Sequence, residues 1–336
     1  MTKRIGIWGT GGIARRHAKA ISETNGCELV AVCGRAMEKA EQLAADSPQA
    51  NVAAFDDYER FLDESRLNVL YHCVTPDAQQ GQAEAAAQRG IHLFLEKPVA
   101  LDPAKVAAIS EACEEAGVKA QVGHHLRFGS AVRRVKRLIE SGDAGVPTLF
   151  SGRWWCNMWG GDWWRDPQRS GGQTIEQVIH IYDLAHHLFG RVAEVSGRVA
   201  NLAHADKEGY HVEDTAAGLL QFENDAIGVV TGSNASTPKR WLGECRLVCS
   251  NLTAHLDGGN AGVIERYDDR PDADVDRVEH EEDVDMYAAA LRNLLSAIDG
   301  DERLISPLSD AAHTTAIAVA VGESSRNGGA PVRPSQ

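Results

Sequence analysis

A glycine-rich turn close to the N-terminus constrains the fold of this chain more than any other feature. A short apolar run at residues 3–8 leads directly into Gly9-x-Gly11-x-x-Ala14, and residues 13–22 favour a helix. In this order of strand, turn and helix, such a pattern holds a dinucleotide pyrophosphate against the first N–H groups of the helix. The alternative is an ordinary strand–turn–helix. The position of the pattern, at the end of a strand and the start of a helix, favours dinucleotide binding.

The second predicted strand, residues 27–33, ends where dinucleotide-binding folds select between NAD and NADP. An acid at this place binds the ribose 2′-hydroxyl of NAD, whereas an arginine binds the 2′-phosphate of NADP. Gly34 and Arg35 stand there without an acid. The sequence therefore favours NADP over NAD, unless Arg35 is only a solvated turn residue. The predicted cofactor contacts are Gly9, Thr10, Gly11, Gly12, Ile13, Gly34, Arg35, Lys39, Thr75, Pro76, Glu96 and Lys97.

Strands and helices alternate through the rest of the first 123 residues. The strand patterns lie at 68–74, 91–95 and 118–122, and the helical ones at 37–45, 78–89 and 103–116. Such alternation predicts a parallel sheet with helices on both faces. Ligands of these sheets bind beyond the C-terminal ends of the strands. The residues predicted at those ends are Gly9, Arg35, Thr75, Lys97 and His124.

Lys97 is the first candidate for chemistry. It follows an apolar strand and Glu96, and it precedes Pro98, which fixes the local backbone. A lysine at a strand end beside a nicotinamide can hold an alcohol or ketone oxygen and stabilise developing negative charge. The alternative is a surface lysine paired with Glu96.

A tryptophan-rich segment marks the second half of the chain. Five of the seven tryptophans lie between residues 154 and 164, beside Gly160-Gly161. Indole rings stack well on the apolar face of a sugar, although some of these rings are expected to pin the loop to the sheet. The predicted substrate contacts here are Trp155, Trp163, Trp164 and Arg165, the last of which is equally suited to an ion pair.

Residues 174–190 are predicted to form one helix. Glu176, His180, Asp183 and His187 recur at helical spacing and would share one face. A metal site competes, but no third ligand is fixed by spacing and no His-Glu-x-x-His occurs, so no metal is predicted. Histidine titrates near neutral pH, which makes His180 the candidate general acid or base. Asp183 would orient it, and Glu176 would line the site.

The remaining segments predict a second, antiparallel sheet with meander connections. Strand patterns lie at 149–155, 192–203, 214–222, 226–234, 245–249 and 254–257, and helical ones at 286–298 and 311–324.

Composition excludes several classes of protein. The net charge of −14 opposes nucleic-acid binding, and ten acids against two arginines in residues 268–285 contribute −8 of it, as expected of a solvated loop and strand edge. No apolar run is long enough for a membrane span, and no signal peptide is visible. The seven cysteines form no C-x-x-C and are expected to be reduced. We therefore expect a cytoplasmic protein.

Several motifs occur in a fixed order along the chain. After the glycine turn come Thr75-Pro76-Asp77, Glu96-Lys97-Pro98, His124-His125 before Arg127-Phe128, Trp164-Arg165-Asp166, Ser170-Gly171-Gly172 and His180-x-x-Asp183. This series resembles the Gfo/Idh/MocA oxidoreductases, the relatives of glucose–fructose oxidoreductase and inositol dehydrogenase. The resemblance implies a Rossmann domain and an α/β domain with a large open, mostly antiparallel sheet, often used for dimer or tetramer contacts. It also implies that Lys97 and His180 are catalytic and that the Lys97–Pro98 bond is cis.

The sequence departs from the family pattern in three places. Glu176 stands where an Asp is usual, Val178 where a Gly is common, and Gln80 where a His usually follows Thr-Pro-Asp. These differences bear on the substrate more than on the chemistry.

We therefore predict an α/β protein with a doubly wound Rossmann domain over residues 1–123 and a substrate-binding and oligomerisation domain over residues 124–336. The predicted activity is hydride transfer between a nicotinamide and a secondary carbinol carbon of a sugar or cyclic polyol, in a homodimer or homotetramer. Lys97, His180 and Glu176 are the predicted catalytic residues. The predicted substrate contacts are Lys97, His124, Arg127, Trp155, Trp163, Trp164, Arg165 and Glu176. The alternatives are a nicotinamide-dependent glycoside hydrolase that oxidises its sugar transiently and a non-catalytic NADP-responsive regulator.

Overall fold

The computed structural model describes residues 2–158, 160–268 and 270–335. Its contacts divide the chain into two units. Unit 1 comprises Met1–Ala100, Ala104–His124 and Asp285–Ala311, and unit 2 comprises Leu101–Pro103, His125–Val284 and Ala312–Gln336. The chain thus returns to unit 1 after residue 284, whereas a single boundary at 123/124 assigns all later residues to the second domain. The two domains proposed from the sequence stay a prediction.

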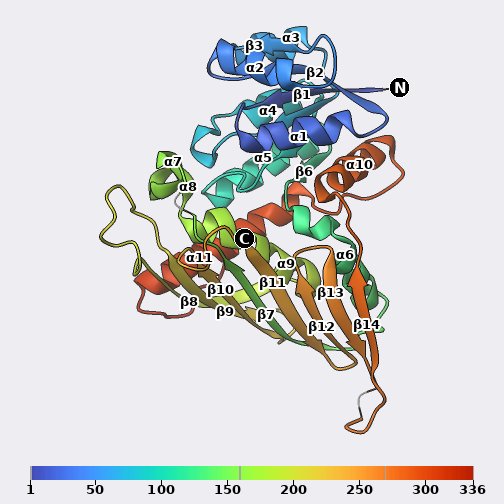
Figure 1. Cartoon of the computed structure of the whole chain (residues 1–336), viewed down its shortest axis with the longest axis vertical. Coiled ribbons are helices and arrows are strands. Elements are labelled where there is room, and N and C mark those ends of the chain that lie inside the picture. Colours follow the sequence, from blue (N-terminus) through green and yellow to red (C-terminus); the bar gives the residue numbers. More distant parts are fainter. Residues whose placement is uncertain (1, 159, 269, 336) are drawn as a thin grey trace. The chain divides into compact units, whose positions relative to one another are not determined.

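Unit 1 is built on a six-stranded parallel sheet in the order β3-β2-β1-β4-β5-β6 (Figure 1). Its strands are β1 (Lys3–Trp8), β2 (Cys27–Cys33), β3 (Ala53–Phe55), β4 (Val69–His72), β5 (His92–Leu95) and β6 (Ala120–Val122). This strand order is that of a doubly wound dinucleotide-binding sheet, in which the order reverses beside β1. The predicted fold of the N-terminal half is confirmed.

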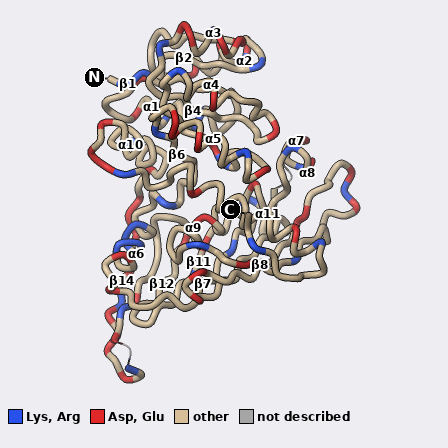
Figure 2. The backbone as a smooth tube through the Cα atoms, turned by 180° about the vertical axis from the view of Figure 1, so that it is seen from behind, with Lys and Arg blue, Asp and Glu red and all other residues tan. Residues whose placement is uncertain are grey.

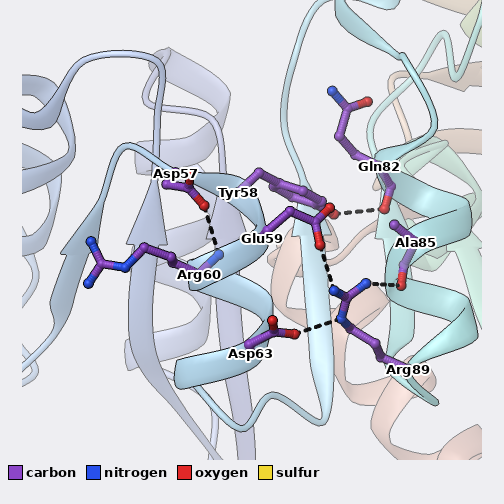
Figure 3. A network of polar contacts seen from close by, with 8 residues as sticks. All are labelled: Asp57, Tyr58, Glu59, Arg60, Asp63, Gln82, Ala85 and Arg89. Carbon is purple, nitrogen blue, oxygen red and sulfur yellow. Dashed lines mark hydrogen bonds and ion pairs between the residues drawn. The ribbon is translucent and has the colours of Figure 1, made fainter.

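Helices accompany this sheet because its strands are apolar on both faces, as in β4, where every residue is buried. They are α1 (Gly12–Ser22), α2 (Met37–Asp46), α3 (Tyr58–Glu64), η1 (Pro76–Ala78), α4 (Gln82–Gln88), α5 (Pro103–Glu115) and α10 (Met286–Asp299). Polar contacts tie α3 to the segment of α4 (Figure 3). The Arg89 guanidinium donates to the carboxylates of Glu59 and Asp63, and the Tyr58 hydroxyl donates to the Gln82 carbonyl.

Unit 2 is built on an eight-stranded sheet in the order β14-β13-β12-β11-β7-β10-β9-β8. Its strands are β7 (Pro147–Trp155), β8 (Val192–Ala200), β9 (Thr215–Phe222), β10 (Ile227–Ser233), β11 (Leu242–Cys249), β12 (Leu252–Asp257), β13 (Ala261–Arg266) and β14 (Asp276–Glu281). Among these, β7 and β10 pair in parallel, and the other neighbours pair antiparallel. The prediction of a large, mostly antiparallel sheet is confirmed, with β7 inserted between two meanders.

Helices cover one face of this sheet. Those that pack on it are α6 (Ser130–Glu140), η3 (Thr174–Val178), α9 (Ile179–Phe189) and α11 (Leu308–Arg326). Three short helices, η2 (His125–Phe128), α7 (Asp162–Arg165) and α8 (Pro167–Ser170), lie in the connections before α9. Helix α9 lies so close to β7 that a Cβ on Gly152 would stand 2.4 Å from Ile181 Cγ2. The opposite face is open and carries exposed apolar side chains at Leu149, Leu219, Ile227 and Val229.

The acidic segment predicted as a loop and strand edge contains β14, the edge strand of the sheet. Figure 2 shows acidic and basic residues side by side along it. Asp276 pairs with Arg266 at 2.5 Å, and Arg277 lies 3.1 Å from Glu279. This exposed edge is therefore charged, as is usual where a sheet must not pair with another chain.

The predicted single helix over 174–190 differs from the structure. Residues Thr174–Val178 form a π-helical turn, η3, and the α-helix α9 begins at Ile179. The Glu213 carboxylate accepts the Thr174 N–H at 2.7 Å and so holds the start of this turn from outside the helix. Glu176 and His180 are thus joined by a wider turn than a regular α-helix has, and such turns are frequent at functional sites.

No helix in the part of the chain that the structure describes combines the length and apolarity needed to cross a membrane.

Candidate functional site

The glycine turn of unit 1 packs closely against the C-terminal ends of the two strands that flank β1. Gly9 has φ +118°, and a Cβ there would stand 2.1 Å from the Cys73 carbonyl oxygen. The Gly9 N–H donates to the Cys33 carbonyl at 2.8 Å. Only glycine satisfies both the backbone angle and the close approach.

The start of α1 fits a bound pyrophosphate. The helix is capped by Gly11, which offers no side-chain hydrogen bond, and its first turn has no acid. A Cβ on Gly11 or Gly12 would meet nothing within 4 Å, so open space faces the N–H groups there. These groups and the helix dipole form an anion site. The residues predicted to hold the dinucleotide phosphates therefore fit that group.

The end of β2 presents basic rather than acidic side chains. Arg35 and Lys39 are both exposed, and a Cβ on Gly34 would stand 2.6 Å from Thr10 Cγ2. The nearby Asp57 caps α3 by accepting the Arg60 N–H at 2.8 Å. The first charged group after β2 is thus Arg35, which suits a phosphate, whereas Glu38 in the first turn of α2 is an exposed acid beside Lys39.

Thr75 and Pro76 follow β4. Thr75 precedes η1 as its N-cap, and Pro76 is buried at the first position of that short helix. Together they fix the chain at the C-terminal end of the strand beside β1.

Lys97 follows β5 in the same sheet. The Lys97–Pro98 peptide bond is cis, as the resemblance implied. Lys97 is half-buried, and its backbone N–H donates to Glu96 Oε2 at 3.2 Å. Glu96 Oε1 lies 2.6 Å from His17 Nε2 on α1. The Glu96 carboxylate therefore contacts the backbone of Lys97 and a helix that sequence spacing did not link to it.

His124 completes the predicted residues of unit 1. It is buried just after β6, and its N–H donates to the Val122 carbonyl at 2.8 Å.

In unit 2, His180 lies in the first turn of α9 among aromatic rings. Its ring centroid is 4.7 Å from that of His125 and 5.0 Å from that of Trp154, and its side chain is buried. Glu176 is also buried, and its carboxylate accepts from the Trp164 indole at 2.7 Å and from the Gln177 amide. The unit thus holds a buried imidazole and a buried, hydrogen-bonded carboxylate within one helical turn of each other in sequence.

Arg127 and Asp183 form a buried ion pair. Arg127 Nε and Nη2 donate to the two Asp183 oxygens at 2.8 and 2.7 Å, and both side chains are at most 1% exposed. Thr314 Oγ1 lies 3.3 Å from Asp183 Oδ1. Sequence reasoning assigned Arg127 to the substrate and Asp183 to the orientation of His180. The structure brings the two together and shows Arg127 linking η2 to α9.

His187, expected on the same helical face, lies near the C-terminal end of α9 and is mostly buried. Burial lowers the pKa of His187 well below its ordinary value, and the nearby Arg127 lowers it further. This environment therefore disfavours the charged form of the imidazole. The described residues include no group of three His, Cys, Asp or Glu side chains arranged to hold a metal ion.

Comparisons with known proteins decide the family. The family model described as "Oxidoreductase family, NAD-binding Rossmann fold" matches residues 3–124, and that of the GFO/IDH/MocA C-terminal domain matches residues 132–255. The scyllo-inositol 2-dehydrogenase (NAD(+)) of Bacillus subtilis is 32% identical over 236 residues, which cover 69% of this chain and 68% of that protein. The chain belongs to the Gfo/Idh/MocA family of oxidoreductases.

Other relatives agree with this family. The D-apiose dehydrogenase of Paraburkholderia graminis is 30% identical over 246 residues, or 70% of this chain and 61% of that protein. A levoglucosan dehydrogenase in complex with NADH and levoglucosan superposes with a TM-score of 0.90 at 17% identity, over all of both chains. The WlbA dehydrogenase of Bordetella pertussis, in complex with NADH and UDP-GlcNAcA, gives 0.83 at 22% identity, again over all of both chains. These structures show the same fold.

Two departures from the family pattern have clear surroundings. Val178 is fully buried, and its Cγ2 lies 2.5 Å from the position that a Cβ on Gly232 of β10 would take. Gln80 is exposed in the loop before α4, where its N–H donates to Gln82 Oε1. Val178 thus adds bulk between η3 and the sheet, whereas Gln80 is at the surface of unit 1.

The tryptophans serve different purposes. Trp164 is buried in a small cluster with Tyr210 and Val212, and Trp163 packs against the same cluster. Trp155 lies on the open face of the sheet, where the Arg153 guanidinium stands 4.3 Å from its ring. Trp159 lies outside the described residues.

This arrangement favours the pinning role for Trp164. Trp155 alternates with Trp154 along β7, so the two rings lie on opposite faces of the sheet. The Arg165 guanidinium donates to the Asp162 carboxylate. The substrate roles of these residues stay predictions.

Sequence reasoning missed His125 and Trp154 as neighbours of His180. A signal for Trp154 was present, because β7 alternates and Phe150, Gly152 and Trp154 share its covered face. His125 carried a weaker one, as the second member of the His124-His125 pair.

Proposed function

We propose that this protein transfers a hydride between a nicotinamide and a secondary carbinol carbon of a sugar or cyclic polyol. The observation that carries the proposal lies within unit 1. Lys97 directly follows β5, and the glycine turn directly follows β1, at the C-terminal edge of one parallel sheet in which only β4 lies between them. Ligands of such sheets bind at this edge. The relatives named scyllo-inositol 2-dehydrogenase and D-apiose dehydrogenase support the substrate class.

The chain supplies binding and proton transfer. When bound, the nicotinamide supplies the hydride acceptor or donor. The Lys97 ammonium holds the reacting oxygen and stabilises negative charge on it as the bond to hydrogen changes. His180 takes the hydroxyl proton during oxidation and returns it during reduction. Glu176, fixed by the Trp164 indole, borders the substrate.

The test is turnover of a polyol panel followed at 340 nm. We expect purified protein with NADP or NAD to reduce the nucleotide when given at least one of myo-inositol, scyllo-inositol, D-apiose or levoglucosan. Lys97→Ala and His180→Ala should each lower kcat by about 10²- to 10⁴-fold while nucleotide still binds. Unchanged turnover in both variants would contradict the proposal. Hydrolysis of a glycoside without net change in the nucleotide would favour the transient-oxidation alternative.

For the cofactor, we propose a preference for NADP that depends on Arg35. The exposed Arg35 and Lys39 and the absence of an acid at residues 34 and 35 support it. Tryptophan fluorescence titrated with NADPH and with NADH measures the preference. We expect tighter binding of NADPH, and Arg35→Asp should reverse the order. Lys119→Asp is the charge-matched control, because Lys119 is exposed just before β6, at the N-terminal edge of the sheet. Tighter binding of NADH by the unmodified protein would show that Arg35 does not read a 2′-phosphate.

For the assembly, we propose a homodimer or homotetramer formed through the open face of the unit 2 sheet. Leu149, Leu219, Ile227 and Val229 are exposed there, and a cavity of about 230 Å³ lies on the same face beside Arg153. An apolar patch of this kind marks an interaction surface. Light scattering of the eluted protein should give a multiple of 36.3 kDa, and Leu219→Glu should shift it towards the monomer. A monomeric wild-type protein would refute this assembly.

A further inference from the structure

A buried histidine on the dinucleotide helix contacts the carboxylate next to Lys97. His17 lies on α1, one helical turn after Ala14 of the glycine pattern, and its side chain is 1% exposed. Its Nε2 stands 2.6 Å from Glu96 Oε1, although 79 residues separate them in the sequence. An ionised carboxylate only accepts hydrogen bonds, so with Glu96 ionised it is Nε2 that donates.

Aromatic rings enclose this pair. The His17 ring centroid lies 4.9 Å from that of Tyr71 and 4.9 Å from that of Phe94, and these two rings stack on each other at 4.4 Å. Tyr287 of α10 closes a further side at 5.4 Å. Close packing by these rings therefore restricts the orientation of the imidazole.

The Glu96 carboxylate occupies a space that the chain keeps free for it. A Cβ on Gly123, just after β6, would stand 2.7 Å from Glu96 Oε1 and 3.0 Å from Oε2. The side chain is 9% exposed, so it lies inside the end of the sheet. Burying a carboxylate is unfavourable unless it is paired and hydrogen-bonded. His17 supplies one of the hydrogen bonds that a buried carboxylate at this place requires.

The second oxygen of Glu96 accepts the backbone N–H of Lys97 at 3.2 Å. A continuous set of contacts thus runs from α1, whose first turn faces the proposed phosphates, through His17 and Glu96 to the main chain of Lys97. We propose that His17 and Glu96 are a positioning pair that sets the backbone of Lys97 relative to the dinucleotide turn. This inference rests on the proposed function, because it assigns the pair's effect to the ammonium that holds the reacting oxygen.

The pair acts more strongly on the chemical step than on nucleotide binding. His17 lies after the first turn of α1, so loss of the pair leaves the N–H groups that face the proposed phosphates in place. A displacement of about 1 Å in a group that holds the reacting atoms lowers the rate by about 10²-fold. Loss of the pair should therefore lower kcat by a larger factor than it lowers nucleotide affinity, to which Glu96 and Lys97 are also predicted to contribute.

The test compares His17→Leu, His17→Gln and Phe94→Leu. Glutamine places an N–H near the position of Nε2, whereas leucine fills the cage without a donor. Phe94→Leu disturbs the same cage and keeps the pair, so it reports the cost of altered packing alone. Each variant is measured for kcat with the panel substrate that the wild type uses fastest, for NADPH affinity, for melting temperature and for amide hydrogen exchange in a peptide covering residues 95–99.

We expect His17→Leu to lose about 10- to 100-fold in kcat, to lose a smaller factor in NADPH affinity, and to exchange the Lys97 amide faster. His17→Gln should recover most of both losses. Phe94→Leu should lower the melting temperature at least as much as His17→Leu but keep kcat. The exchange measurement needs neither substrate nor nucleotide.

Two results would overturn the inference. One is wild-type kcat and wild-type exchange at Lys97 in His17→Leu. The other is a loss in His17→Leu that Phe94→Leu matches and His17→Gln does not recover, which would make the role one of packing. Lys97→Ala separates this inference from the proposed function. If Lys97→Ala is inactive while His17→Leu turns over normally, only the positioning role fails. If Lys97→Ala is fully active, both the positioning role and the proposed function fail.

Discussion

Removing one partner of the buried pair of Arg127 and Asp183 should strongly destabilise unit 2. Both side chains are at most 1% exposed and are joined by two hydrogen bonds of 2.7 and 2.8 Å. Arg127→Met removes the cation and leaves the Asp183 carboxylate buried. Removal of one partner of a buried ion pair costs about 3–5 kcal/mol, because a charge stays in a medium that solvates it poorly. A unit of 150–250 residues loses about 2–4 °C per kcal/mol, so we expect a fall of about 6–20 °C.

The assay is a double-mutant cycle followed by near-ultraviolet circular dichroism during heating. Arg127→Met, Asp183→Leu and the double variant are compared with the wild type. The double variant should be more stable than the sum of the single effects predicts, because no unpaired charge remains. Arg191→Met is the control, since Arg191 pairs with Glu223 at the surface of the same unit and both are about half exposed. Equal melting of Arg127→Met and the wild type would refute the reasoning.

Two further predictions concern unit 1. Gly9→Ala should lower the melting temperature and abolish nucleotide binding, because its Cβ would stand 2.1 Å from a carbonyl oxygen at a φ of +118°. Gly12→Ala, whose Cβ meets nothing within 4 Å, should keep the melting temperature and weaken only NADPH binding. Equal melting temperatures of the two variants would contradict this. Burial, aided by Lys105, lowers the pKa of His72 to about 3. Between pH 3 and its ordinary pKa of about 6.5, the unfolded chain therefore binds a proton that the folded chain does not. Stability should therefore fall as pH falls through this window, by at most about 1.4 kcal/mol per pH unit from this group. Urea unfolding at several pH values should show a shallower dependence in His72→Leu, and an unchanged dependence would argue that His72 is protonated in the folded state.

The alternation of apolar strands with helices predicted five of the six strands of unit 1, but it missed the three-residue strand β3 and helix α3. The edge strand β14 was not predicted, because Asp276–Glu281 is polar and none of its residues is buried. Its neighbour β13, Ala261–Arg266, was also missed, and Ile264 is its single buried residue. Edge strands lack the buried face that produces alternation. Helix α6, Ser130–Glu140, was also missed although it shows a clear helical period, with Ala131, Val132 and Val135 buried.

The π-helical turn η3 was beyond sequence reasoning. Its residues favour a helix, and its first N–H, that of Thr174, is bound by Glu213, a residue of another segment. Burial raises the pKa of Glu213, while its contact with Thr174 partly offsets this. Contacts of this kind are tertiary and override local propensity.

Motifs placed Lys97, His180 and the glycine turn, but they did not give partners. His17 and Glu96 are 79 residues apart, and Arg127 and Asp183 are 56 apart. The sequence did carry a hint for His17, which shares the buried face of α1 with Ala14, Ala18 and Ile21. A polar side chain on an apolar helical face requires a partner, and only the fold identifies it.

The most direct test of the central claim is the transfer of deuterium. The protein is given the panel substrate that it oxidises fastest, deuterated at the carbinol carbon, together with NADP. Mass spectrometry of the reduced nucleotide should show one deuterium per turnover at C4, because the hydride moves directly from carbon to carbon. Reduced nucleotide without deuterium, or product without reduced nucleotide, would contradict hydride transfer as the activity of this protein.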